Sequence, residues 1–458
     1  MKETTLPQLL QIAAERSARY LSTIAERRVA PDAASVERLA AFDRPFPEGP
    51  SDPAQVLEEL DLVGSPGTVA TTGGRFFGFV IGGALPATLA ANWLAGAWDQ
   101  NAGMAVTAPS AAKLETVALR WLLEALGLPA ACGAGFVTGA TMANFTGLAA
   151  ARHALLAGAG WDVEAQGLFG APPITVVVGE EVHVSVLKAL ALLGLGRERV
   201  VRVPADGQGR MRPDLLPAFP GPTIVCLQAG NVNTGAFDPM GELCDRAHAA
   251  GAWVHVDGAF GLWAAASPRY AHLAAGIERA DSWSVDGHKW LNVPQDSGIV
   301  FCRYPEAMRG AMAAHASYLI HGSAREPDEY TPEFSRRARG IEIWAALASL
   351  GRSGLADLVE RCCAHASRFA EGLSAAGCEI LNEVVLNQVM VSFGDAATTR
   401  RAIAGIQEDG TCWCGGTVWQ GRTAMRISVS SWATTAADVE RSLAAIRRVA
   451  RECGARTT

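Results

Sequence analysis

The sequence predicts an α/β protein whose large domain has a mostly parallel central sheet, followed by a small α+β domain. Two observations lead to this prediction. Between residues 174 and 302, short runs rich in Val and Ile alternate with helical segments, which is typical of a parallel sheet covered on both faces. After about residue 345 the order becomes helix, strand, helix, strand, helix, as in a small α+β domain.

The chain length predicts several parts, because 458 residues exceed what one small core holds. We expect an N-terminal helical arm over 1–66, a large domain over 67–345 and a small domain over 346–458. A hydrophobic fraction of 49% and a charged fraction of 19% indicate a folded globular chain. The net charge of −7 argues against nucleic acid or an anionic membrane as the main partner, and no apolar run is long enough to span a bilayer.

The ten cysteines predict neither a disulfide framework nor a metal site. Cys412 and Cys414 have the wrong spacing for a zinc knuckle, and the start of the chain lacks the pattern of a signal peptide. We therefore expect reduced thiols and a cytoplasmic protein.

Taken in order, the chain begins with helices joined by Pro-rich loops, becomes rich in Gly and aromatic residues from Gly73, and forms a helix over about 111–126. The predicted strands of the large domain are 174–178, 199–203, 223–227, 253–257 and 298–302. The predicted helices between them are 142–156, 184–194, 239–250 and 268–278. A helix over 336–350 leads into the small domain, whose strands we expect at 388–393 and 424–430.

Two residues carry the chemistry that we expect. Asp257 ends the apolar run WVHVD, and a buried carboxylate is costly unless it has a partner. Lys289 follows a polar loop and abuts Trp290 and Leu291, where desolvation favours a nucleophilic free amine. An amine that can form an imine, together with a carboxylate that can hold a protonated pyridine nitrogen, indicates a pyridoxal phosphate site. A helix cap is the alternative interpretation of Asp257.

Three further segments fit the same cofactor. The turn Gly139-Ala140-Thr141 precedes a helix whose first N–H groups would bind a phosphate. His183 enters a helix, where its ring could stack on an aromatic cofactor. Thr234 lies in a strand-end loop of the kind that lines ligand sites. Each segment also has a structural interpretation: a helix cap for the first two and turn chemistry for the third.

The order of these segments resembles the group II pyridoxal-phosphate-dependent amino acid decarboxylases, which have the aspartate aminotransferase fold (fold type I). The most specific marks are HVD at 255–257, DGHKW at 286–290 and SRRARGIEIWAALASLGRSGL at 335–355. The resemblance covers residues 70–350 well and the C-terminal part loosely, through AMRISVS. It implies pyridoxal 5'-phosphate as the cofactor and a homodimer with shared active sites.

The resemblance also implies a role for each candidate residue. Lys289 would form the imine with the cofactor, and Asp257 would pair with its pyridine nitrogen. His183 would stack on the ring, with Ala259 packed behind it. The residues expected near the phosphate, the imine or the ring hydroxyl are Ala140, Thr141, Thr234, Ser284 and His288.

Two points concern departures from the family. Its members protonate the substrate carbon from a tyrosine on a loop, for which Tyr330 is the candidate and Tyr318 and His321 are competitors. Two residues before the His-Lys pair stands Asp286, where an asparagine or serine is common. Because a carboxylate would repel the phosphate, we expect Asp286 to face elsewhere.

The expected activity is decarboxylation of an L-amino acid to the amine and CO2. We favour an aromatic or apolar side chain, because no basic cluster marks a site for an acidic one. Aldol cleavage, transamination and carbon–sulfur lysis on the same fold also use Lys289 and Asp257, so they stay open. A catalytically inactive binding homologue is the alternative from a different class.

Overall fold

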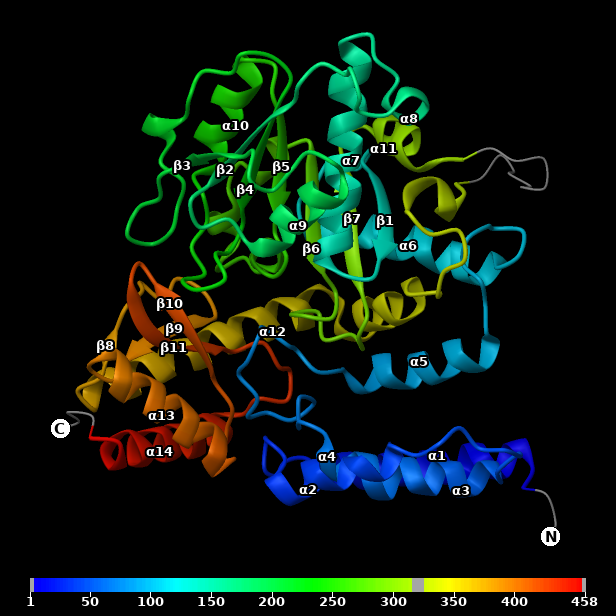
Figure 1. The fold of residues 1–458 in the computed structure, drawn as a ribbon, viewed down its shortest axis with the longest axis vertical. Helices are drawn as coiled ribbons and strands as arrows, with labels where there is room; N and C mark the ends of the chain where they lie inside the picture. Colours follow the sequence, from blue (N-terminus) through cyan, green and yellow to red (C-terminus); the bar gives the residue numbers. More distant parts are fainter. Residues whose placement is uncertain (1–3, 315–324, 455–458) are drawn as a thin grey trace. The chain divides into compact units, whose positions relative to one another are not determined.

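The computed structural model describes residues 4–314 and 325–454, which form two compact units (Figure 1). The larger unit comprises Gly82–Ser367 and Asn382–Val389. The other unit combines the residues up to Ile81 with Arg368–Leu381 and the residues from Met390 onward. The N-terminal segment and the C-terminal residues therefore share one unit, whereas the sequence prediction separated them.

The larger unit is built on a seven-stranded sheet with the strand order β1-β7-β6-β5-β4-β2-β3. Only β7 among these strands is antiparallel to its neighbours, so β1 and β6 run in the same direction on either side of it. All strands except β7 therefore end at one edge of the sheet. The strands are β1 (Gly133–Val137), β2 (Thr175–Gly179), β3 (Val201–Val203), β4 (Thr223–Gln228), β5 (Trp253–Asp257), β6 (Ser282–Asp286) and β7 (Gly298–Cys302).

Helices cover this sheet and bury its strands. Helix α7 (Ala140–Gly158) contacts β1, β5, β6 and β7 and packs on α9 (Val184–Leu192) and α11 (Pro305–Met312), while α10 (Met240–Ala249) packs on β5 (Figure 1). Strands buried on both faces explain the continuous apolar runs from which β2, β4, β5 and β7 were predicted. This unit also includes α5 (Pro86–Trp98), α6 (Pro109–Ala125) and α8 (Val163–Gln166).

The predicted strands at 253–257 and 298–302 are confirmed to the residue. The predicted helix over 268–278 is wrong: the chain forms two 3-10 turns, Ala271–Ala274 and Ile277–Arg279, with Gly276 between them at φ 86°. Two strands of the seven-stranded sheet were not predicted, β1 and β6. Strand β6 replaces the polar loop that we expected before Lys289, because its polar side chains Ser282, Ser284 and Asp286 are buried and hydrogen-bonded.

The other unit begins with α1 (Leu6–Thr23), α2 (Ala33–Glu37), α3 (Pro53–Glu59) and α4 (Ser65–Gly67). A second sheet has the order β10-β11-β9-β8. Its strands are β8 (Glu379–Ile380), β9 (Gln388–Ser392), β10 (Gly415–Trp419) and β11 (Arg422–Ser428), accompanied by α13 (Ala396–Asp409) and α14 (Ala436–Glu452). Helix α12 (Gly340–Ala375) belongs to the larger unit up to Ser367 and is interrupted at Gly351, whose φ of 59° suits a residue without a side chain.

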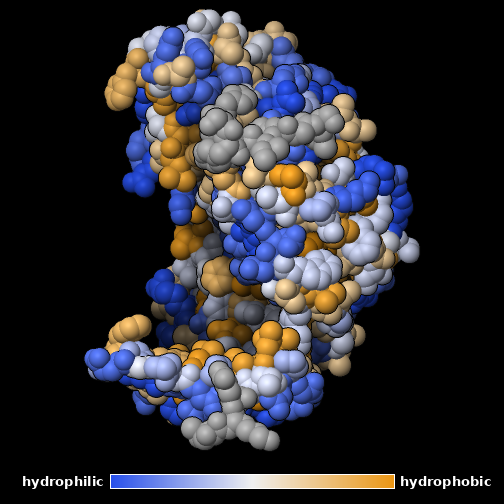
Figure 2. All heavy atoms as spheres, turned by 90° about the vertical axis from the view of Figure 1, so that its right-hand side faces the viewer, coloured by the Kyte–Doolittle hydropathy of each residue, from blue (hydrophilic) through white to orange (hydrophobic). Residues whose placement is uncertain are grey.

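Hydrophobic residues are exposed among polar ones on the face that Figure 2 presents. Large apolar side chains that the structure leaves exposed include Leu6 and Leu10 on α1 and Trp93, Leu94 and Trp98 on α5. Among the described helices, none combines the length and the hydropathy that a bilayer-spanning segment needs.

Candidate active site

Four of the predicted site residues lie at the edge where the strands end. Ala140 follows β1, His183 follows β2, Asp257 ends β5, and Lys289 lies three residues beyond β6. The antiparallel strand β7 begins at this edge with Gly298, and a Cβ atom there would lie only 2.5 Å from the backbone of Gly139. Because Gly298 has no side chain, the start of β7 can approach the turn that follows β1.

Lys289 occupies a mostly buried position. Its side chain is 19% exposed, and its Nζ lies 3.0 Å from an Oδ of Asp286. The other lysines that the structure describes, Lys113 and Lys188, are exposed. A lysine rarely gives up hydration without a function or a partner; Asp286 is a partner of this amine, and its chemical role stays a prediction.

The prediction that Asp286 faces elsewhere is wrong. Its Oδ1 accepts a hydrogen bond of 2.5 Å from the backbone N–H of Ala140, the first residue of α7, and its other oxygen pairs with Lys289. A carboxylate is stabilised by the positive end of a helix and by an ammonium group. Asp286 therefore lies at the helix terminus that was predicted for the phosphate, and a phosphate bound there would lie close to this carboxylate.

His288 is held in a defined orientation beside Asp286. Its Nδ1 accepts the backbone N–H of Ser297 at 2.9 Å, so in the neutral ring the proton is on Nε2, which lies 3.6 Å from Asp286. Burial lowers the pKa of His288, and Lys289 acts in the same direction against the opposing effect of Asp286. The ring is therefore neutral near pH 7.

Asp257 is oriented by three donors. Its Oδ1 accepts the N–H of Ala259 at 3.1 Å, while Oδ2 receives Nδ2 of Asn144 at 3.2 Å and Oγ of Ser185 at 3.3 Å. His183 caps α9 by accepting the N–H of Ser185, and its Nδ1 lies 2.7 Å from the hydroxyl of that serine. His183 thus acts as the helix cap of the alternative interpretation and also lies next to the Asp257 group.

Two predicted site residues make contacts elsewhere. Ser284 donates to Oδ1 of Asn144 at 2.6 Å, and Asn144 also donates to Asp257. Ser284 therefore belongs with Asp257 and Asn144 and not with Asp286 and Ala140. Thr234 donates to the carbonyl of Gln208 at 2.7 Å and accepts the N–H of Ala236, so its hydroxyl closes the loop after β4. Their roles toward a cofactor stay predictions.

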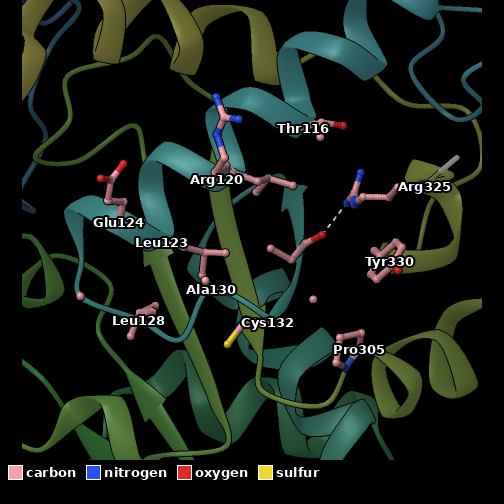
Figure 3. A pocket seen from close by; sticks show the side chains of 14 residues that line it. Thr116, Arg120, Leu123, Glu124, Leu128, Ala130, Cys132, Pro305, Arg325 and Tyr330 are labelled. Carbon is pink, nitrogen blue, oxygen red and sulfur yellow. Dashed lines mark hydrogen bonds between the residues drawn. The ribbon is translucent and has the colours of Figure 1, made fainter.

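Tyr330 is not brought to these residues within one chain. It is buried at the other end of β1, where a Cβ on Gly133 would lie 3.3 Å from its ring and the guanidinium of Arg325 lies 4.5 Å from the ring centre. Tyr330 and Arg325 line a cavity of about 670 Å³ (Figure 3) that includes no residue of the Lys289 and Asp257 groups. The competitors Tyr318 and His321 lie outside the described residues.

Three residues of the site escaped the sequence prediction: Asn144, Ser185 and His255. Each is fully or almost fully buried. The signal that could have found them is a polar residue inside an apolar pattern, since Asn144 lies in ANFTGLAAA and His255 lies inside WVHVD.

Two buried groups near the strand ends have displaced pKa values. Burial raises the pKa of Asp238 to about 6, against the effect of the N–H groups of Met211 and Gln228, each 2.7 Å away. Burial lowers the pKa of His255 to about 4, while Asp257 acts in the opposite direction. Asp238 therefore adds stability below about pH 4 that is lost as the pH rises through 6, whereas His255 adds stability at pH 7 that is lost as the pH falls toward 4.

Asp238→Asn is therefore expected to change the acid dependence of stability. The difference in unfolding free energy, wild type minus variant, should fall by about 3 kcal/mol between pH 4 and pH 7, because only the wild type must bury an ionised group at the higher pH. Differential scanning calorimetry at both pH values would show the gap between the Tm values moving by several degrees in favour of the variant. Asp245→Asn, at an exposed position, gives the baseline, and a gap that does not depend on pH would contradict the prediction.

The fold and the site together define a class of enzyme. A mostly buried lysine and a carboxylate oriented at the end of β5 fit the aldehyde and the ring nitrogen of pyridoxal phosphate, while the first N–H of α7, which was expected at the phosphate, is taken by Asp286. The chain matches the pyridoxal-dependent decarboxylase conserved domain over residues 37–393, which is most of its length. It belongs to this family of enzymes, which use pyridoxal phosphate to decarboxylate amino acids.

Individual relatives and solved structures agree with this assignment. The chain is 32% identical over 397 residues to an L-2,4-diaminobutyrate decarboxylase of Rhizobium meliloti, covering 81% of this chain and 76% of the relative. It is 28% identical over 343 residues to an aromatic-L-amino-acid decarboxylase of Bacillus atrophaeus, covering 72% and 68%. A crystal structure of Oryza sativa TDC with PLP and tryptamine shares the fold, with a TM-score of 0.89, 23% identity and coverage of 98% of both chains.

Proposed function

We propose that this enzyme decarboxylates an aromatic or otherwise apolar L-amino acid to the amine and CO2, at the site formed by Lys289 and Asp257. The observation that carries the choice of site is the buried amine of Lys289 at the same sheet edge as the oriented carboxylate of Asp257. The relatives differ in the substrates that their names give, diaminobutyrate in one and aromatic amino acids in the other, so family membership leaves the side chain open.

The charges next to Lys289 support an uncharged substrate side chain. Two titratable groups beside Lys289 are Asp286, which pairs with the amine, and His288, whose pKa is lowered by burial. Neither is a cation that could pair with a carboxylate on the side chain of a substrate. An acidic substrate side chain near Lys289 would therefore add a second negative charge beside that of Asp286.

The proposed roles follow from the positions of the residues. Lys289 would hold the aldehyde carbon of the cofactor covalently, Asp257 the ring nitrogen, and His183 and Ala259 the two faces of the ring. Ala140, Thr141 and His288 would lie near the phosphate. When bound, the cofactor supplies an electron sink for the pair left behind by CO2. Asp257 keeps the ring nitrogen protonated, and Lys289 returns as a free amine to release the product.

A panel of L-amino acids tests the substrate class. The full chain loaded with pyridoxal phosphate is incubated with tryptophan, tyrosine, phenylalanine, leucine, diaminobutyrate, aspartate and glutamate, and the products are identified by mass spectrometry. We expect amine and CO2 from the aromatic or apolar members. Turnover of aspartate or diaminobutyrate alone would reject the proposed side chain, and formation of a ketone or aldehyde in place of the amine would reject the reaction.

Tyr330 can be tested as the proton donor to the substrate carbon against its competitors, Tyr318 and His321. We expect Tyr330→Phe to leave most of the activity, because this ring is buried at the end of β1 that is remote from Ala140. Tyr318→Phe or His321→Gln, whichever removes the donor, should lower amine formation by about 100-fold, the effect of removing a general acid. Steady-state rates with cofactor binding measured in parallel check these variants. A large loss in Tyr330→Phe alone would mean that Tyr330 reaches an active site from a second copy of the chain.

We further propose that the enzyme is a cytoplasmic homodimer. Exposed apolar side chains on α1 and on α5 offer surface that a second copy could cover. All ten cysteines are free thiols in the structure, which is consistent with a reducing compartment.

A further inference from the structure

A row of buried polar side chains leads away from Asp257 into the core of the larger unit. It consists of Asn144 on α7, His255 and Trp253 on β5, and Ser282 on β6. Asn144, His255 and Ser282 are fully buried. None of the four has a part in the proposed chemistry. Burying four polar side chains lowers the stability of the protein unless each one is hydrogen-bonded.

The direction of each hydrogen bond in the row can be assigned, starting from the tryptophan. The indole N–H of Trp253 can only donate, and Ser282 Oγ accepts it at 2.9 Å. The hydroxyl of Ser282 then donates to Nδ1 of His255 at 2.8 Å. Burial lowers the pKa of His255 to about 4, so the ring is neutral and its proton is on Nε2. Nε2–H donates to Oδ1 of Asn144 at 2.9 Å.

Only one orientation of the Asn144 amide satisfies its neighbours. Its Oδ1 accepts from His255 and from the hydroxyl of Ser284, while its Nδ2 donates to Oδ2 of Asp257 and to Oγ of Ser185, both at 3.2 Å. The reversed amide would turn an oxygen toward the carboxylate of Asp257 and an N–H group toward the N–H of His255. Every hydrogen bond of the row therefore points toward Asp257.

The backbone of α7 is shaped to bring this amide in. Gly147 lies about one turn beyond Asn144, and a Cβ atom there would lie 2.9 Å from Cε1 and 3.0 Å from Nδ1 of His255. The glycine therefore allows the helix to approach the imidazole closely enough for Asn144 to reach both His255 and Asp257.

We propose that Asn144 is a positioning residue that fixes the carboxylate of Asp257 toward the cofactor's ring nitrogen, with neutral His255 as the donor behind it. The proposal rests on the proposed role of Asp257. The row of aligned donors holds the carboxylate of Asp257 in one orientation. The positive ends of the donors' dipoles also point toward this carboxylate. Asn144 and His255 then govern how strongly the protein prefers a cofactor ring that carries a nitrogen.

The preference can be measured as binding and does not require turnover. The dissociation constants of pyridoxal phosphate and of its 1-deaza analogue, in which C–H replaces the ring nitrogen, are determined on the cofactor-free full chain by quenching of tryptophan fluorescence. We expect the wild type to prefer pyridoxal phosphate. Asn144→Leu should reduce that preference by at least about tenfold, through weaker binding of pyridoxal phosphate alone.

The control is Thr146→Val on the same helix. Its hydroxyl is buried and, among the described residues, bonds only to the carbonyl of Met142 at 2.8 Å, so its loss should leave the preference unchanged. Equal weakening of both ligands by Asn144→Leu would show a purely structural role and overturn the proposal, as would an unchanged preference. A wild type without any preference would overturn the role of Asp257 and, with it, this proposal.

A second pair of variants keeps the test valid if Asn144→Leu does not fold. His255→Gln can present an N–H group where Nε2–H lies, whereas His255→Leu cannot. The glutamine variant should retain the preference within a few-fold and the leucine variant should lose most of it. The same preference in both variants would exclude a donor role for His255 and overturn the proposal.

Discussion

Replacing Lys289 with alanine is expected to lower the rate of decarboxylation by at least about 1,000-fold, because the reaction then loses the nucleophile that exchanges with the substrate amine. The variant should fold normally, since the lysine side chain makes one described ion pair, with Asp286, and is 19% exposed. Amine formation by the loaded protein measures the effect. Lys188→Ala, at an exposed position on α9, is the matched control and should keep full activity.

The same variant offers a readout that does not depend on turnover. Borohydride reduction of the loaded wild type should fix the cofactor on Lys289 and abolish its visible absorbance band, and mass spectrometry should find the label on that peptide. The other lysines of the sequence are Lys2, Lys113 and Lys188, so the labelled residue can be assigned without ambiguity. Label on any of these three, or an absorbance band that persists in Lys289→Ala, would contradict the assignment of the lysine.

The parts of the fold that could be predicted are those in which local pattern and burial agree. Strands β5 and β7 were predicted to the residue because WVHVD and GIVFC are short, apolar and bounded by turn residues. Strand β6 was missed because Ser282, Ser284 and Asp286 make SWSVD look like an exposed loop. Ser282 is hydrogen-bonded to β5, Ser284 to α7, and Asp286 to the first N–H of α7. These partners lie far away in the sequence, so the local sequence cannot reveal them.

The candidate site, like the fold, has parts that could be predicted from the sequence and parts that could not. That Lys289, Asp257 and His183 lie at one edge of the sheet follows from one general rule, since parallel strands end at one edge and place their following residues there. The orientation of Asp286 could not be predicted, because it depends on the first N–H of α7 lying 2.5 Å away, 146 residues earlier in the sequence. Tyr330 was chosen from its place in the sequence alone, and only the packing of its ring against β1 shows how remote it is from Lys289.

Asp257→Asn is expected to lower kcat/KM by about 100-fold or more while the protein keeps its fold. The amide has the size of the carboxylate but no charge, so it cannot hold the ring nitrogen protonated, and the stabilisation of developing charge is lost. The carboxylate now accepts from the N–H of Ala259, from Asn144 and from Ser185. An asparagine can keep some of these contacts, which limits the cost in stability.

Asp281→Asn is the matched control for this variant, because it makes the same change at an equally buried aspartate just before the start of β6, at the other end of the strand from Asp286. Asp281 accepts the N–H of Val254 at 2.7 Å and pairs with His248 at 2.9 Å, so its loss should lower the Tm and leave kcat/KM close to the wild-type value. Asp257→Asn should show the reverse pattern, a small change in Tm and a large loss of activity. If both variants lose activity only in proportion to their loss of folded protein, Asp257 has a structural role and the cofactor nitrogen must be held by another group.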